Sequence, residues 1–306
     1  MKAKLWGEWF FGGGLILLSL SHWFPFGINF LELLGAFAHA TCILSLIIAV
    51  VSAFMRLWPL AGSSLLAFAV SGLLILPHLS TPEMSGNSDF SVGQFNVYHN
   101  NPIPQDAIAT IAQNAPDVFT IQELNSEWQT TIDSRFLKTH PYRIEEYWDN
   151  CCYGIGVYSK YPITHSRLLD LEKLPAIECT INVNGKDVNL LSLHTFPPAF
   201  PNQTEARNLQ LKQAEQIISA MNNPLLVIGD LNLVSWDRTL TQFLQRQELN
   251  SARDGFMATY PMDLGFPLIP IDHMLYKGPI APTRCETFDI PGSDHKGLVA
   301  SFAFKE

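Results

Sequence analysis

Long apolar runs dominate the first quarter of the chain. Three of them hold 18 to 22 residues each and lie at Trp9–Phe26, Leu33–Phe54 and Leu57–Pro77. A helix of this length can cross the ~30 Å hydrocarbon layer of a membrane. The first run follows Lys2 and Lys4 and would, by itself, also fit a signal peptide. Together the three runs predict a membrane anchor of three transmembrane helices over residues 1–79.

The few basic residues of this region predict its orientation. Lys2 and Lys4 precede the first run and Arg56 lies between the second and third, whereas the connection 22–27 has no Lys or Arg. By the positive-inside rule, the N-terminus and the turn at Arg56 are cytoplasmic. Three crossings then place the rest of the chain on the other side. We therefore predict a multi-pass protein of the cell (inner) membrane whose C-terminal domain is extracytoplasmic.

Strand and helix patterns alternate after a polar linker at residues 80–89. Apolar positions at helical spacing predict helices at 104–114 and 205–221. Alternating or continuous apolar runs predict strands at 90–97, 118–123, 154–159, 177–183, 188–193, 225–228, 271–276 and 297–304. Some strands follow one another directly and others are separated by helices, which predicts a mixed-sheet α/β domain over residues 90–306.

The charge distribution disfavours nucleic acid as a partner without excluding it. The formal net charge of -9 lies wholly from Met84 onward, where 16 Lys and Arg residues stand against 25 Asp and Glu residues. An acidic domain does not attract polyanions at long range. The sequence also has no basic groove pattern and no aromatic ladder of the kind that binds single strands.

The five cysteines have no metal-ligand spacing. Cys151 and Cys152 are adjacent and could be oxidised with Cys179 or Cys285 if the domain lies outside the cytosol. An odd number of cysteines without a regular framework favours reduced, partly buried thiols instead.

Polar side chains stand where the predicted strands end. The aliphatic run Leu225–Ile228 fits a strand buried on both faces, and Asp230 and Asn232 follow it directly. In α/β proteins, functional sites often lie at the carboxyl ends of such strands. Further strand ends and neighbouring turns contribute Asn96, Glu123, His194, Asp272, Asp294 and His295. Each residue alone also fits an ordinary turn, a surface acid or a core histidine, so the prediction rests on the set.

The chemistry of this set predicts metal-assisted hydrolysis. Carboxylate and amide oxygens suit Mg²⁺, with Mn²⁺ as an alternative. No Gly-x-Ser-x-Gly turn or activated-cysteine signature indicates a covalent nucleophile. We therefore expect a water activated by a carboxylate, with a metal ion and imidazoles stabilising the charge.

Six short motifs in a fixed order resemble a known family. They are Gln94-Phe-Asn-Val97, Ile121-Gln-Glu123, Leu193-His194, Gly229-Asp-Leu-Asn232, Ile271-Asp-His273 and Gly292-Ser-Asp-His295. From about Phe90 to the C-terminus the chain resembles the endonuclease/exonuclease/phosphatase superfamily, which includes DNase I, apurinic endonucleases, inositol polyphosphate 5-phosphatases and neutral sphingomyelinases. The resemblance implies a DNase I-like, four-layer α/β sandwich of two mixed β-sheets flanked by helices, with Mg²⁺ bound in the cleft at the sheets' ends.

The resemblance also implies roles for the acidic and amide side chains. Glu123 would be the principal metal ligand, with Asn96 beside it and Asp294 as a further ligand. Asp230 would orient or deprotonate the attacking water. Asn232 would position Asp230 and the phosphate.

The histidines receive roles from the same resemblance. His295, held by Asp272, would face the phosphoryl oxygens and stabilise the pentacovalent transition state. His194 would be a second catalytic imidazole that donates to the phosphate or to the leaving oxygen.

Three apolar runs ahead of such a domain resemble one bacterial branch of the superfamily. The stretches His194-Thr-Phe-Pro-Pro198 and Arg207-Asn-Leu-Gln-Leu211 are similar to membrane-anchored members, including VanJ-type glycopeptide-resistance proteins. In that branch the catalytic domain is extracytoplasmic and acts on lipid-linked or membrane-proximal phosphoesters. Arg207 is then a candidate substrate-binding residue, a clamp for the phosphate, or else a solvated charge in the first turn of a helix.

Three functional hypotheses follow from the sequence. The first is a membrane-tethered, Mg²⁺-dependent phosphoesterase that hydrolyses a phosphate or pyrophosphate bond of a phosphorylated or lipid-linked small molecule. The second is an extracytoplasmic endonuclease or exonuclease of the same fold. The third is a catalytically silent receptor or scaffold domain, although every mapped motif position carries a chemically competent side chain.

Overall fold

The chain forms two compact units. The computed structural model describes residues 2–24, 29–80, 84, 86–114, 116–200, 202–222 and 224–305. The first unit is mainly the N-terminal region up to Ser80, with the short segments Pro198–Thr204 and Trp236–Arg238, and the second contains the rest.

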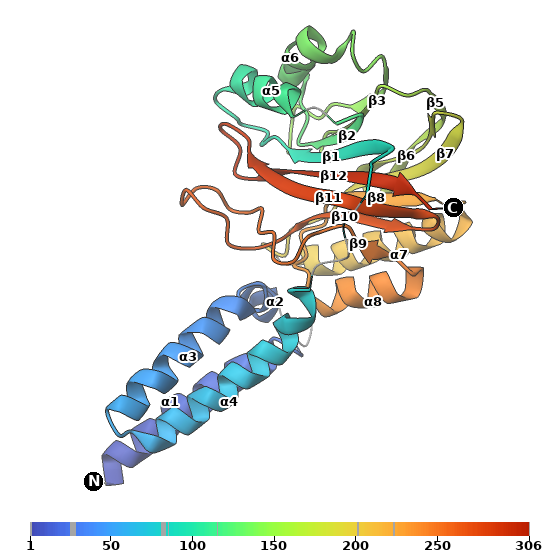
Figure 1. The fold of residues 1–306 in the computed structure, drawn as a ribbon. Coiled ribbons are helices and arrows are strands. Elements are labelled where there is room, and N and C mark those ends of the chain that lie inside the picture. Colours follow the sequence, from blue (N-terminus) through green and yellow to red (C-terminus); the bar gives the residue numbers. More distant parts are fainter. Residues whose placement is uncertain are drawn as a thin grey trace. The chain divides into compact units, whose positions relative to one another are not determined.

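The first unit is helical. Its elements are α1 (Lys2–Ser21), α2 (Asn29–Ala36), α3 (Ala38–Phe54), α4 (Trp58–Ile75) and the short 3-10 helix η1 (Leu76–His78). Helix α4 packs against both α1 and α3, and Figure 1 shows these three long helices side by side.

Small residues lie inside this helical unit and large apolar residues lie outside. The buried positions of α3 and α4 are Ala38, Thr41, Ser45, Ala49, Ser52, Ala61, Ser63, Ser64, Ala67, Ser71 and Ile75. By contrast, the side chains of Phe10 and Phe54 are 78% and 91% exposed. Helices that pack in lipid show this arrangement, because small residues allow close approach and apolar surface need not be hidden from hydrocarbon.

One described helix is long and apolar enough to cross a membrane. It runs over Trp58–His78, while Phe30–Ala36 and Ala38–Phe54 would make a second span only as a pair bent by 70°. The apolar part of α1, Leu5–Ser21, is shorter. The structure therefore supports one or two candidate spans, and the three spans, their orientation and the extracytoplasmic domain stay predictions.

The boundary between anchor and domain also stays a prediction. Residues 81–83 and 85 of the predicted linker, and residues 25 and 26 at the end of the first apolar run, lie outside the described residues. The first strand, β1, begins at Phe90.

The second unit contains two mixed, six-stranded sheets. The first sheet has the order β11 (Ile280–Asp289), β12 (Lys296–Phe304), β1 (Phe90–Asn96), β2 (Val118–Gln122), β4 (Ile155–Ser159) and β3 (Tyr142–Glu146). The second has the order β5 (Ile163–Leu171), β6 (Leu174–Val183), β7 (Lys186–His194), β8 (Leu225–Asp230), β10 (Asp272–Lys277) and β9 (Asn250–Ser251). The pairs β1–β2 and β7–β8 are parallel and the other pairs are antiparallel. The predicted mixed sheets are confirmed.

Three apolar clusters define four layers. One lies between the sheets and includes Val92, Ile177 and Ile228. A second joins the first sheet to helices α5 (Pro104–Gln113) and α6 (Ser126–Phe136), and a third joins the second sheet to α7 (Gln203–Ala220) and α8 (Arg238–Gln247). Figure 1 shows one pair of helices beyond each sheet. The predicted α/β sandwich of two sheets flanked by helices is therefore present.

Strand alternation carries polar residues into the layer between the sheets. On β8, Leu225 and Val227 join the cluster under the helices, whereas Leu226 and Ile228 join the cluster between the sheets. Because the side-chain period of a strand is 2, Asp230 continues the inter-sheet series. The carboxylate thus lies at the rim of a hydrophobic layer, where it is only 2% exposed.

Gly229 allows β7 and β8 to approach closely just before Asp230. A Cβ at this position would lie 1.7 Å from the carbonyl oxygen of Leu193, and the glycine has a φ of 153°. Gly185, in the turn between β6 and β7, has a φ of 91° but an added Cβ would meet nothing within 4 Å. A side chain at Gly185 would therefore meet only backbone strain, whereas a side chain at Gly229 would also collide with the backbone of Leu193.

Gly229→Ala should destabilise the protein more than Gly185→Ala. We expect losses in the free energy of unfolding of about 3 kcal/mol and about 1 kcal/mol, because only the first substitution adds a collision to conformational strain. Urea unfolding of the full chain, followed by near-UV circular dichroism, measures both values. Equal losses would contradict the close approach of the two strands.

Candidate active site

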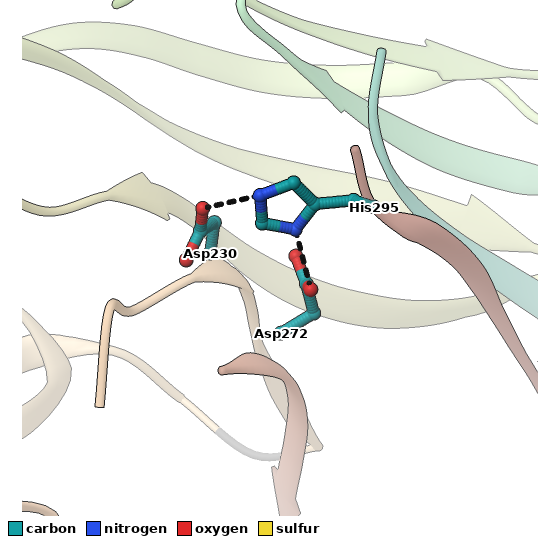
Figure 2. A group of neighbouring side chains, drawn as sticks. All are labelled: Asp230, Asp272 and His295. Atoms are coloured by element: carbon teal, nitrogen blue, oxygen red, sulfur yellow. Dashed lines mark hydrogen bonds and ion pairs between the residues drawn. The ribbon is translucent and has the colours of Figure 1, made fainter. Parts of the chain in front are cut away.

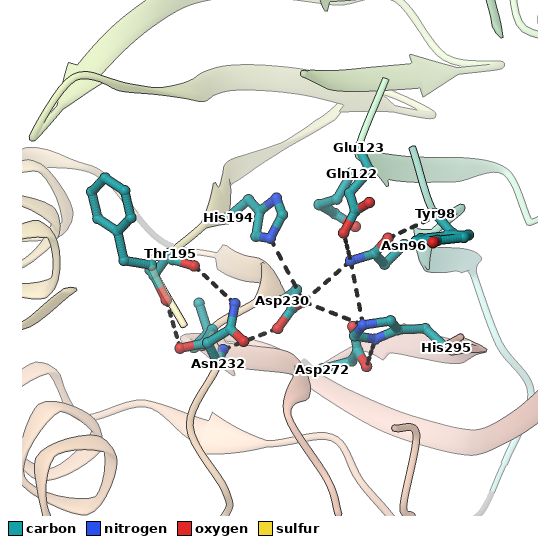
Figure 3. A network of polar contacts seen from close by, with 12 residues as sticks. Asn96, Tyr98, Gln122, Glu123, His194, Thr195, Asp230, Asn232, Asp272 and His295 are labelled. Atoms are coloured by element: carbon teal, nitrogen blue, oxygen red, sulfur yellow. Dashed lines mark hydrogen bonds and ion pairs between the residues drawn. The ribbon is translucent and has the colours of Figure 1, made fainter. Parts of the chain in front are cut away.

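The central strands bring the predicted residues to one edge of the sheets. In the second sheet, Asp230 is the register partner of both His194 on β7 and Asp272 on β10. In the first sheet, Asn96 on β1 is the partner of Gln122, which immediately precedes Glu123. Figure 3 shows these side chains converging from the two sheets.

A buried histidine lies between two buried aspartates. The Nδ1 atom of His295 is 2.8 Å from Oδ2 of Asp272, and its Nε2 atom is 3.7 Å from Oδ2 of Asp230 (Figure 2). The second oxygen of Asp272 accepts a hydrogen bond of 2.8 Å from the Gln94 amide. With both oxygens engaged, Asp272 fixes the orientation of the imidazole, as the sequence predicted for this pair.

Asn96 connects this group to Glu123. Its Nδ2 atom donates to Oε1 of Glu123 at 3.0 Å and to Oδ2 of Asp230 at 3.2 Å, as Figure 3 shows. The other oxygen of Glu123 accepts a hydrogen bond of 2.7 Å from the backbone N–H of His99. Glu123 has a φ of 69°, so its backbone turns sharply where β2 ends.

The turn after β8 fixes Asp230. The backbone N–H of Asn232 donates to Oδ1 of Asp230 at 3.0 Å, and the Asn232 side chain donates to the carbonyl oxygen of Thr195 at 2.8 Å. Asn232 has a φ of 50°, a left-handed conformation that Asn tolerates better than most residues. Asn232 therefore positions Asp230 through its backbone and ties the turn to the end of β7 through its amide.

A second imidazole reaches Asp230 from β7. The Nε2 atom of His194 is 3.7 Å from Oδ2 of Asp230, the same oxygen that His295 approaches. The ring of Tyr153 packs at 5.1 Å from the His194 ring and at 5.5 Å from that of Phe196. The Nδ1 atom of His194 is buried and has no hydrogen-bond partner among the described residues.

The two histidines have opposite pKa shifts. Burial lowers the pKa of His295, but the charge and hydrogen bond of Asp272, and then the charge of Asp230, outweigh it and raise the pKa to about 10. Burial, together with the charge of His295, lowers the pKa of His194 to about 3. Near neutral pH the site therefore holds one imidazolium and one neutral imidazole.

The pKa values of the two aspartates are also shifted in opposite directions. Burial, and then the charge of Asp272, raises the pKa of Asp230 to about 8. Burial also acts to raise the pKa of Asp272, but the charge and hydrogen bond of His295 outweigh it, and the pKa lies below its ordinary value. Asp272 is thus the ionised partner of His295, and Asp230 can exchange a proton near neutral pH.

Glu123, Asn96 and Asp294 fit a divalent cation. Burial raises the pKa of Glu123, the hydrogen bonds from His99 and Asn96 and the charge of His295 act against this rise, and the negative charge of Asp294 adds to it. The Oδ1 atom of Asp294 is buried and has no hydrogen-bond partner among the described residues. A cation would bind the carboxylate oxygens of Glu123 and Asp294, which suit Mg²⁺. Asn96 would have to turn its amide to offer an oxygen, because its Nδ2 atom donates to Glu123 and its Oδ1 atom accepts from the N–H of Tyr98.

A second candidate metal site consists of two aspartates and a histidine. The ligand atoms of Asp230, Asp272 and His295 lie within 4.8 Å of one another. A cation bound to this group would have to compete with the 2.8 Å contact between Asp272 and His295. Among the described residues, the group around Glu123 has no such carboxylate–imidazole contact to break, and its role as the metal site stays a prediction.

Arg207 is buried on α7. Its side chain is only 1% exposed, and Nη1 lies 3.4 Å from the carbonyl oxygen of Asn232. The structure thus brings Arg207 to the turn that holds Asp230. Its role as a phosphate clamp stays a prediction.

Sequence reasoning missed several supporting residues. Gln94 bonds to Asp272 and to Gln122, the Thr259 hydroxyl meets the backbone N–H of Asp272 at 3.4 Å, and the Tyr260 ring packs at 4.8 Å from the His295 ring. Gln94 could have been found, because it precedes Asn96 by two positions and so faces the same layer. Thr259 and Tyr260 belong to the long connection from β9 to β10, which shows no periodic pattern.

All five cysteines are free thiols in the structure. Cys179 and Cys285 are buried, and the other three are partly buried. The arrangement agrees with the interpretation of reduced thiols.

Comparison with known proteins relates the fold and the motifs to one family. The model of the Endonuclease/Exonuclease/phosphatase family matches residues 93–295. No curated protein matches the chain. Solved structures that are similar to the chain share its fold of two β-sheets flanked by helices.

Three of these structures illustrate the range of proteins with this fold. D. rerio TDP2 complexed with single strand DNA product has 16% identity and a TM-score of 0.56, over 70% of this chain and 98% of that chain. Sphingomyelinase C from Streptomyces griseocarneus has 15% identity and a TM-score of 0.55, over 71% and 99%. The mannosyl-6-phosphatase Bt3783 of Bacteroides thetaiotaomicron has 14% identity and a TM-score of 0.57, over 70% and 99%.

Glu123→Gln should weaken the binding of Mg²⁺ by about 10-fold or more, because it removes a negative ligand from the proposed site. Asp272→Asn should leave Mg²⁺ affinity little changed. Isothermal titration of the full chain with MgCl₂ measures both, after circular dichroism has verified that each variant is folded. A greater loss in Asp272→Asn than in Glu123→Gln would place the cation in the group of Asp230, Asp272 and His295 instead.

Proposed function

The chain belongs to the endonuclease/exonuclease/phosphatase family, and from this premise we propose that it is a membrane-tethered, Mg²⁺-dependent phosphoesterase that acts on a lipid-linked substrate. The general class is that of the metal-dependent phosphoester hydrolases. The membrane tether, the choice of Mg²⁺ and the lipid-linked substrate are the specific parts of the proposal.

Asp230 is the proposed acceptor of the proton from the attacking water. Its pKa of about 8 lies in the range where a carboxylate can act as a general base near neutral pH. The Asn232 backbone and the Asn96 amide each donate to it, so the carboxylate is held in one orientation. A base held in place avoids the cost of ordering it during the reaction.

The two imidazoles would act on the phosphoryl group in different ways. His295, which carries a positive charge at neutral pH, can donate to a phosphoryl oxygen as negative charge develops. His194 is neutral at this pH and can donate or accept only one proton at a time. His194 therefore suits a positioning contact to the phosphate or the leaving oxygen.

Glu123, Asn96 and Asp294 would hold the cation. When bound, Mg²⁺ supplies positive charge to the phosphoryl group. The site without it holds several carboxylates, which would repel a phosphate dianion. Activity should therefore require the metal.

The lipid-linked proposal is supported by the presence of two features in the same chain. The same polypeptide has this acidic and imidazole centre and at least one helix, Trp58–His78, with the length and composition of a membrane span. A tether holds the site near the bilayer, where a lipid-linked phosphate is concentrated. The net charge of -9 beyond the apolar region disfavours nucleic acid.

Asp230→Asn should lower kcat by about 10² to 10⁴-fold, because the amide keeps the shape of the carboxylate but cannot accept a proton. The measurement is inorganic phosphate release from polyprenyl pyrophosphate by the full chain in detergent, with Mg²⁺ or with EDTA. EDTA should abolish release by the unsubstituted protein. Asp187→Asn, on the exposed start of β7, is the control for loss of a carboxylate and should keep full activity.

A plasmid DNA assay run in parallel separates the alternatives. Metal-dependent nicking of DNA without phosphate release would contradict the lipid-phosphate proposal and favour the nuclease. No hydrolysis of either substrate would favour the receptor or scaffold.

A fusion at the C-terminus tests the proposed location. If the catalytic domain is extracytoplasmic, alkaline phosphatase fused after Glu306 should be active in a bacterial host, and a fused green fluorescent protein should be dark. This follows because the phosphatase needs oxidative folding and the fluorescent protein exported in unfolded form does not mature. The reverse pattern would refute the predicted topology.

A further inference from the structure

A buried arginine lies behind the Asp272–His295 pair. Arg253 directly follows Ala252, whose N–H bonds to the carbonyl oxygen of Met274, so the chain runs alongside β10 at this point. The Arg253 side chain is 4% exposed, and its Nη1 atom donates to the backbone carbonyl oxygen of Asp272 at 2.8 Å. The contact joins Arg253 to the first residue of β10.

The hydrogen bonds of Arg253 leave most of its guanidinium unsatisfied. Within the described residues, Nε and Nη2 are buried and have no hydrogen-bond partner. Burial lowers the pKa of Arg253 to about 10, which still leaves the group charged near neutral pH. A buried cation with one neutral acceptor is costly unless a negative charge lies nearby.

Asp272 can supply that charge. Two acidic groups act on the guanidinium through their charge, Cys285 and Asp272. Burial raises the pKa of the Cys285 thiol to about 12, so the thiol is neutral at pH 7. The pKa of Asp272 lies below its ordinary value, so this carboxylate is ionised.

Asp272 thus lies between two cationic groups. His295 approaches its side chain at 2.8 Å, and Arg253 binds its backbone carbonyl. The Gln94 amide holds the second carboxylate oxygen. These contacts leave the carboxylate little freedom to rotate away from the imidazole.

We propose that Arg253 is a positioning residue that fixes the start of β10 through its hydrogen bond to the carbonyl oxygen of Asp272 and adds a second buried positive charge, beside that of His295, near this carboxylate, thereby holding His295 in its catalytic orientation. The inference rests on the proposed function for its catalytic part. Its electrostatic part, the coupling of Arg253 to Asp272, rests on the burial of both groups, on the contact to the Asp272 backbone and on the charge of Asp272 acting on the pKa of Arg253, and it does not depend on the proposed function.

The coupling predicts that Arg253→Met lowers Tm when Asp272 is present and raises Tm when Asp272 is replaced by Asn. Arg253→Met removes the charge at similar volume, and in the otherwise unchanged chain it should lower Tm by at least about 5 °C, because Asp272 loses one of the two positive charges near it and its backbone carbonyl loses a donor. In an Asp272→Asn background the same substitution should raise Tm, because it removes a buried cation that no longer has a partner. Arg143→Met, which breaks the pairing of Arg143 with Asp133 and Glu145, is the control and should change Tm equally in both backgrounds.

The catalytic part predicts a loss in kcat that a positive charge rescues. Arg253→Met should lower kcat by about 10- to 100-fold with little change in KM, as for other residues that orient catalytic groups. Arg253→Lys keeps the charge and should recover most of the lost kcat. Phosphate release from polyprenyl pyrophosphate at 25 °C, below the Tm of each variant, measures both.

Two results would overturn the proposal. One is an equal drop in Tm for Arg253→Met in both backgrounds, which would identify a packing residue. The other is a folded Arg253→Met variant with unchanged kcat. An unsubstituted chain without phosphoesterase activity would contradict the proposed function instead, whereas the Tm comparison uses no substrate and still tests the coupling.

Discussion

The site depends on burying two carboxylates between two apolar sheets. Asp230 and Asp272 are 2% and 0% exposed and are register partners on adjacent strands. Two ionised carboxylates could not share such a position at low cost, since each would lose its hydration and repel the other. The imidazolium of His295, in contact with both, resolves this conflict, because Asp272 keeps its charge and Asp230 takes a raised pKa. The contacts that lower the cost of burying the two carboxylates also leave Asp272 ionised, His295 positively charged and Asp230 able to exchange a proton near neutral pH.

Opposite pKa shifts arise here from similar positions. His194 and His295 are both buried, and the Nε2 atoms of both lie 3.7 Å from the same oxygen of Asp230. Only His295 has an aspartate at its other ring nitrogen, and the Nδ1 atom of His194 has no partner among the described residues. One hydrogen bond therefore decides which imidazole is charged. This difference explains how two similarly placed imidazoles can differ in charge near neutral pH.

The helical unit reverses the usual distribution of residue size. Serine and alanine fill the contacts between α3 and α4, and large apolar side chains point outward. In water this surface would be costly, whereas in hydrocarbon it is not. The composition thus agrees with the proposed tether even where the helices are short or bent.

The sequence by itself determined the interior of the α/β unit and singled out polar residues that the structure gathers at one edge of the sheets. The eight strands that it predicted are the interior strands of the two sheets, because strands buried on both sides must be apolar or alternating. The strands that it missed in the described chain, β3, β5, β9 and β11, are the sheet edges, whose exposed polar residues hide the pattern. Helices α6 and α8, whose sequences are rich in polar residues, were missed as well. Only the tertiary structure decided that Gln94, Thr259 and Arg253 support Asp272, because these contacts join residues 13 to 178 positions apart. It also decided the protonation of the two histidines, since a pKa depends on burial and on neighbouring charges that the order of residues does not reveal.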